Sequence, residues 1–278
     1  MVLLHVLILA IIQGLTEFLP VSSSAHLIFP SHFLGWEDQG LAFDVAVHFG
    51  TLLAVILYYI ADLVKIGSYT IEAAIKFKIT PIARIGLCII IATIPVCIGG
   101  IFLESVVESI RENIHVIAWT TIGFGLLLGF ASYANRKMIW RNISPNQGAR
   151  ADSLRQLTYV QALFIGMAQV IAVIPGTSRS GITLTAGLFL GMKPEAAARF
   201  SFLLSIPVIL ASALFEFLKI YKTPDLTVDW MSIILGSFLS FIVALIVIHL
   251  FLKYIAKSGM ALFVIYRVLL GVVILWLF

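Results

Sequence analysis

The chain of 278 residues is 61% hydrophobic and only 12% charged, with a formal net charge of +4 and a mean hydropathy of +1.08. A water-soluble core cannot hide so many apolar side chains, so the composition excludes a soluble globular protein and predicts an all-α polytopic membrane protein. The basic residues form no face with interleaved aromatics, so they do not indicate a nucleic-acid partner. We expect a single integral membrane domain over residues 1–278.

Six apolar stretches are each long enough for a transmembrane helix, since one crossing takes about 20 residues. They cover residues 41–60, 84–103, 115–134, 196–217, 230–252 and 259–278. Two further apolar regions, 2–34 and 159–190, are interrupted near the middle by proline and serine clusters. A helix stops before such a cluster, and a new helix can begin at the serine that follows. We therefore expect six transmembrane helices plus two helix-turn-helix pairs.

The charges of the connecting loops indicate whether the interrupted pairs cross the bilayer or are re-entrant. If both pairs dip in and return, the basic loop residues collect on one side, namely Lys65, Lys76, Lys78, Arg136, Lys137, Arg141, Arg150, Arg155, Lys193, Lys253 and Lys257. A mostly acidic loop then faces the other side, with Glu104, Glu108, Arg111 and Glu112. Cytoplasmic loops carry an excess of Lys and Arg, so both termini are expected outside. The halves 1 to about 135 and about 155 to 278 then form an inverted-topology repeat.

The two interruptions carry the polar residues of the expected site. They read QGLTEFLPVSSSAH over residues 13–26 and QVIAVIPGTSRSGIT over residues 169–183. Polar groups at membrane depth are costly enough to indicate function. Broken helices of inverted repeats meet near the bilayer midplane, where their N-terminal amides present the positive end of the helix dipole. Two such ends favour an anion, most naturally a phosphate.

Glu17 is the strongest candidate of the first segment, because a membrane carboxylate without a function is uncommon; the alternative is an ion pair or a cap. Gln13 lies one helical turn earlier on the same face. Ser23 and Ser24 could merely cap the second half-helix. His26 could be a packing histidine, but beside serine and glutamate it becomes a candidate general acid or base.

Arg179 is the strongest candidate of the second segment. It follows a Pro-Gly turn at the predicted start of a half-helix, where its guanidinium could bind a phosphate through two parallel hydrogen bonds. The alternative is a counter-ion for Glu17, and both roles could hold in the empty site. Further candidates for binding a substrate are Gln13, Ser22, Ser24, Ser178, Ser180 and Thr183.

Three other polar residues have plainer explanations. Arg267 lies inside the last span and is expected to pair with a buried acid or carbonyl. Asp44 and His48 are one turn apart near the outer end of a span, where they border the site or the membrane interface.

These motifs resemble the undecaprenyl-diphosphatases of the bacitracin-resistance type, integral membrane enzymes of bacterial cell-wall lipid recycling. The resemblance rests on residues 13–17, 20–26 and 175–183, and it extends over the whole length, including 200–204 and Pro207. One departure is that many members of the family carry Glu where this chain has Gln13. A metal or proton role at that place would therefore fall mainly to Glu17.

The resemblance implies hydrolysis of undecaprenyl diphosphate to undecaprenyl phosphate and inorganic phosphate in the bacterial plasma membrane, assisted by a divalent cation such as Mg²⁺ or Ca²⁺. Ser23 is the expected nucleophile, with Glu17 or His26 taking its proton; the rival assignment makes His26 the nucleophile. Arg179 would hold the diphosphate. Because the first segment enters from the outer side, we expect the site to face the periplasm or cell exterior.

A function of another class uses the same features. Inverted repeats with broken helices are also the architecture of secondary transporters, so the chain could carry a phosphorylated lipid or another anion without breaking a bond. Binding alone would not explain a serine, a histidine and a glutamate together. The sequence does not determine the length of the prenyl chain, and it leaves open whether the protein forms a homo-oligomer.

Overall fold

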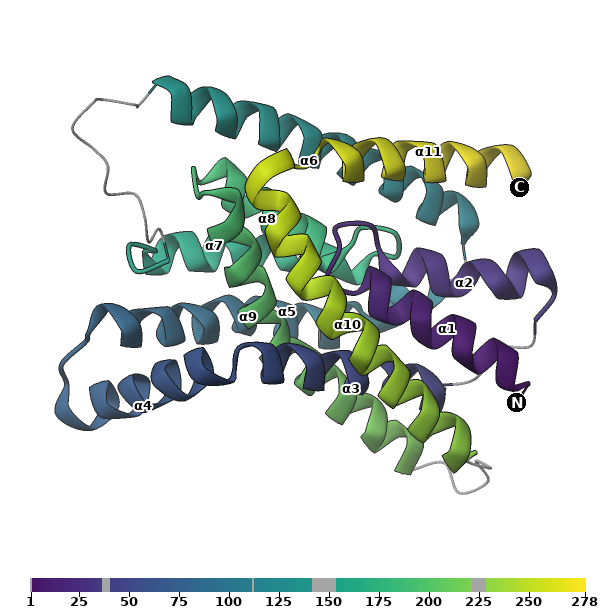
Figure 1. Ribbon diagram of the computed structural model, residues 1–278, viewed down its shortest axis with the longest axis horizontal. Helices are drawn as coiled ribbons and strands as arrows, with labels where there is room; N and C mark the ends of the chain where they lie inside the picture. The colour runs from purple at the N-terminus through teal and green to yellow at the C-terminus, as the bar shows by residue number, and fades with distance from the viewer. Residues whose placement is uncertain (1, 37–40, 112, 142–153, 222–228) are drawn as a thin grey trace.

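The computed structural model describes residues 2–36, 41–111, 113–141, 154–221 and 229–278, and over these residues it is helical without strands (Figure 1). This confirms the all-α expectation. The α-helices are α1 (Leu3–Thr16), α2 (Ser23–Leu34), α3 (Leu41–Tyr58), α4 (Ile60–Lys76), α5 (Pro81–Ile110), α6 (Ile114–Arg141), α7 (Tyr159–Val170), α8 (Arg179–Phe189), α9 (Pro194–Tyr221), α10 (Trp230–Ser258) and α11 (Ala261–Leu277). A short 3₁₀ helix, η1 (Ile171–Val173), extends α7.

Each of the six predicted apolar stretches coincides with a helix: α3, α5, α6, α9, α10 and α11. Among the described residues, four of them are long and apolar enough to cross a membrane alone: α5, α6, α9 and α10. Helix α3 passes the same test together with α4, to which it is joined at a bend of 77°. Helix α11 is apolar but shorter, at 17 residues. The chain is therefore a multi-pass membrane protein.

The prediction of a basic loop after the first span was wrong, because most of this segment is helix α4. Its buried residues, Ile66 and Ala73, lie two turns apart on one face, and α4 packs against α5. Glu72 and Lys76 are exposed and paired at 2.7 Å along the helix. The acidic segment was also misassigned, since α5 continues to Ile110. A search for uninterrupted apolar spans passes over helical segments that have one polar face.

Both interrupted regions form a helix, a turn and a second helix, as predicted. Helices α1 and α2 fold back on each other, and so do α7 and α8. The α1–α2 hairpin opens at the end of the molecule where both termini lie, whereas the α7–α8 hairpin opens at the opposite end (Figure 1). The two turns meet in the middle of the molecule.

The packing relates the two halves of the chain in the way that an inverted repeat requires. Helix α1 packs along α10, and its counterpart α7 packs along α5; α3 packs on α9, and α6 on α11. Both hairpins approach their partner closely through a glycine. A Cβ on Gly14 would lie 2.8 Å from the carbonyl oxygen of Ser240, and one on Gly166 would lie 2.5 Å from that of Ala92.

Candidate active site

The two turns have the same unusual backbone. Ser22 (φ 76°) and Ser178 (φ 70°) precede the second helix of their hairpins, and both lie in a region that residues other than glycine rarely adopt. In each turn this serine contacts the hydroxyl two residues later, at 3.1 Å between Ser22 and Ser24 and at 3.3 Å between Ser178 and Ser180. The hydroxyl of Ser178 also accepts from the Gly181 amide and so caps α8. Strained backbone of this kind is typical of functional sites.

The tips of the two hairpins are in direct contact. The Gly176 amide donates to Ser24 Oγ at 3.4 Å, and Ser180 Oγ donates to the Leu19 carbonyl at 2.8 Å. Each half thus supplies a serine that binds the backbone of the other half. The sequence-based expectation that the two interruptions meet is confirmed.

Arg267 of α11 joins the two turns by binding the backbone of both. It is fully buried, and its guanidinium donates to the carbonyls of Thr121, Pro20, Gly176 and Thr177 at 3.1, 3.4, 2.9 and 2.9 Å. Two glycines leave room for this side chain, since a Cβ on Gly125 or on Gly181 would come within 2.9 Å of it. The expectation that Arg267 pairs with a buried carbonyl is confirmed, but its reach into both turns depends on tertiary packing.

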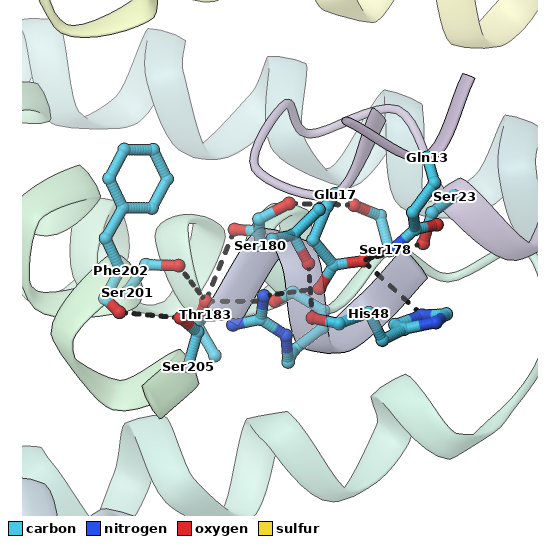
Figure 2. Close-up of polar contacts among 12 residues, drawn as sticks. Gln13, Glu17, Ser23, His48, Ser178, Ser180, Thr183, Ser201, Phe202 and Ser205 are labelled. Atoms are coloured by element: carbon cyan, nitrogen blue, oxygen red, sulfur yellow. Dashed lines mark hydrogen bonds and ion pairs between the residues drawn. The ribbon is translucent and has the colours of Figure 1, made fainter. Parts of the chain in front are cut away.

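Glu17 lies at the centre of the polar cluster and is only 7% exposed. Its Oε2 accepts from Gln13 Nε2 at 2.9 Å and from Ser23 Oγ at 3.1 Å. Its Oε1 accepts from Arg179 Nη2 at 2.9 Å, which is the ion pair weighed as an alternative for both residues. His48 Nε2 lies 3.7 Å from Oε2 (Figure 2). The structure therefore brings Gln13, Glu17, Ser23 and Arg179 together and adds His48 to them.

His26 has other partners. Its Nδ1 lies 2.7 Å from the Ser22 carbonyl oxygen, and its Nε2 lies 2.5 Å from Tyr266 Oη. No hydrogen bond or ion pair within the described chain links it to Ser23 or Glu17. The sequence analysis grouped His26 with these residues because His26 follows Ser23 by three positions. Nothing in the sequence indicated that Tyr266 would contact His26.

Thr183 points away from the carboxylate. Its hydroxyl contacts Ser201 Oγ of α9 at 2.7 Å and the Arg179 carbonyl at 2.9 Å. Figure 2 shows Thr183 and Ser201 on the side of the cluster opposite Gln13 and Ser23. Thr183 thus fixes α8 against α9 and binds the backbone of Arg179.

Several buried polar atoms at the site have no hydrogen-bond partner among the described residues, including Arg179 Nη1 and Gln13 Oε1. Buried polar groups are nearly always paired, so such atoms indicate a place for a ligand. Arg179 Nη1 offers a donor to an anion. Gln13 Oε1 and the Glu17 carboxylate offer oxygens to a hard cation such as Mg²⁺ or Ca²⁺. The described residues contain no cluster of three His, Cys, Asp or Glu.

These features define an integral membrane protein in which two broken-helix hairpins meet at one buried polar cluster, where a serine hydroxyl and an arginine both contact a carboxylate. The chain matches the family model described as "Bacitracin resistance protein BacA" over residues 6–273, and it belongs to this family. The resemblance found in the sequence is thereby confirmed.

Three relatives are similar over nearly their whole length. "Undecaprenyl-diphosphatase 1" of Pseudoalteromonas translucida is 48% identical over 272 residues, which cover 98% of this chain and 97% of the relative. "Undecaprenyl-diphosphatase" of Hahella chejuensis is 48% identical over 276 residues, 99% of this chain and 98% of the relative. The protein of the same description from Alteromonas mediterranea is 47% identical over 276 residues, with the same coverage.

Proposed function

We propose that this protein hydrolyses undecaprenyl diphosphate to undecaprenyl phosphate and inorganic phosphate, and so recycles the lipid carrier of bacterial cell-wall synthesis. Family membership and the names of the full-length relatives support this activity. The observation that carries the proposal is the hydrogen bond from Ser23 Oγ to the buried Glu17 carboxylate, beside the Arg179 guanidinium. Phosphoryl transfer needs at least a hydroxyl bound to a carboxylate base and, next to it, a positively charged group such as a guanidinium that binds the phosphate.

In the proposed complex, Arg179 binds the diphosphate through its free Nη1. Phosphate oxygens also replace part of the contact between Arg179 and Glu17. The first amides of α2 and α8 have no partner within their own helices and carry the positive end of the helix dipole. The hydroxyls of Ser22, Ser24, Ser178 and Ser180 line the same turns. The polyprenyl tail remains in the bilayer.

Ser23 attacks the terminal phosphorus as Glu17 Oε2 takes the proton from its hydroxyl. The bond from this phosphorus to the bridging oxygen breaks, and undecaprenyl phosphate leaves. The proton on Glu17 then passes to the leaving undecaprenyl phosphate. Water attacks the phosphoserine and gives a proton to Glu17, and Glu17 returns this proton to the Ser23 oxygen as inorganic phosphate is released. Contact between Ser23 and Glu17 favours this assignment over attack by His26, whose two ring nitrogens have other partners. A divalent cation held by Glu17 and Gln13 Oε1 would offset the negative charge of the transferring group.

The site faces the periplasm or cell exterior in this proposal, and both termini lie outside. Support comes from the termini sharing one end of the molecule with the open end of the α1–α2 hairpin (Figure 1). The turn between α8 and α9, which carries Lys193, lies at the opposite end (Figure 1), as the positive-inside bias requires. Undecaprenyl diphosphate would then enter from the outer leaflet.

Phosphate release from undecaprenyl diphosphate by purified protein in detergent tests the proposal. We expect turnover by wild type and losses of at least 100-fold for Glu17→Ala, Ser23→Ala and Arg179→Ala. Ser109→Ala is the matched control, because this exposed hydroxyl binds only a carbonyl of its own helix. Retained binding without phosphate release, across several divalent cations, would refute hydrolysis and support an anion or lipid carrier.

A further inference from the structure

His26 is held by two contacts of different kinds. The Ser22 carbonyl, 2.7 Å from Nδ1, belongs to the strained turn residue that begins α2. Tyr266 Oη, 2.5 Å from Nε2, comes from the last helix of the chain, and the two rings are nearly parallel at 6° with centroids 5.7 Å apart. A side chain from the second half therefore orients the histidine of the first half.

These partners determine which ring nitrogen carries the proton. A carbonyl oxygen only accepts hydrogen bonds, so Nδ1 must donate and carries hydrogen. In the neutral imidazole Nε2 then has the lone pair, and it accepts from the phenol hydroxyl of Tyr266. Without this donor the lone pair would have no partner within the protein, and the ring could rotate or change tautomer.

The position of Tyr266 is fixed by its neighbour in sequence. Arg267 is pinned by four carbonyls of α6 and the two turns. Tyr266 therefore cannot shift along α11 without disturbing the turns themselves. Its side chain is 42% exposed, so packing alone does not require a tyrosine there.

We infer that Tyr266 is a positioning residue for the hydrolysis proposed above: it holds His26 in the Nδ1–H tautomer with Nε2 as the proton-accepting atom. This inference rests on the proposed function. It leaves Glu17 as the base for Ser23 and keeps the Nε2 lone pair of His26 oriented to accept a proton through the Tyr266 hydroxyl.

A double-mutant cycle between Tyr266 and His26 tests this role. Tyr266→Phe should lower kcat by about three- to ten-fold, the effect of one hydrogen bond, and leave KM within about two-fold. In a His26→Ala background the same change should alter kcat by less than about two-fold, because the residue it positions is gone. Tyr254→Phe is the matched control, since Tyr254 of α10 packs edge-on against Phe263 of α11.

The tautomer provides an independent measurement. In protein with ¹⁵N-labelled histidine, the His26 signals are assigned by their absence from His26→Gln, and we expect the Nδ1–H form in wild type and a mixture in Tyr266→Phe. An unchanged spectrum, or equal losses from Tyr266→Phe with and without His26, would overturn the inference. If wild type releases no phosphate, the proposed function fails instead, and the spectrum still tests the contact.

Discussion

Replacing Arg267 by methionine should remove the hydrogen bonds that join the two turns, while an unbranched apolar side chain still fills part of the space. The change removes three hydrogen bonds of 2.9 to 3.1 Å and one weaker contact of 3.4 Å. Hydrogen bonds from a charged donor contribute about 1.5 to 3 kcal/mol each, so the three good bonds together contribute roughly 5 to 9 kcal/mol. Removing a buried charge recovers several kcal/mol of desolvation. We therefore expect a net destabilisation of about 3 to 5 kcal/mol.

The free energy of unfolding measured by SDS titration in mixed micelles checks this value, and phosphate release is measured on the same samples. Arg199→Met is the control, because Arg199 is partly exposed and pairs with Asp62 at 2.7 Å. Its loss should cost at most about 1 kcal/mol. Equal stability and equal turnover of Arg267→Met and wild type would refute the reasoning that Arg267 joins the turns.

Three other changes test separate parts of the account. Glu17→Gln keeps the size of the side chain but removes the base, so kcat should fall by at least 100-fold while isothermal titration still detects pyrophosphate binding; wild-type kcat would contradict this. Gly166→Ala pushes a methyl group into the backbone of α5 and should cost about 1 to 3 kcal/mol in SDS titration, whereas Gly100→Ala, which meets open space, should not destabilise. Gln13→Glu adds a second carboxylate, so half-maximal activity should need less Mg²⁺; an unchanged or higher requirement would argue against a cation there.

The broken hairpins were predictable because their signal is local. Pro20 and Pro175 stop a helix inside an apolar run, and the serines that follow begin the next one. The loop charges then favoured opposite insertion of the two hairpins. The inverted repeat alone predicted that the tips of the two hairpins meet, although no single contact between them could be identified from the sequence.

The rest depended on tertiary contacts that sequence spacing does not encode. His48 was assigned to the edge of the site or the interface, yet it lies 3.7 Å from Glu17 because α3 passes beside α1. His26 was grouped with Glu17 by sequence proximity, but its ring nitrogens contact Ser22 and Tyr266. Partners more than 200 positions apart, such as His26 and Tyr266, are visible only in the folded chain.

The central claim is that Ser23, activated by Glu17, takes the terminal phosphate. Rapid quenching of the purified protein with undecaprenyl diphosphate labelled in that phosphate, followed by peptide mapping, tests it most directly. The account predicts an acid-stable label on the peptide with Ser23, absent from Ser23→Ala and retained in His26→Ala. An acid-labile label on His26 would contradict it.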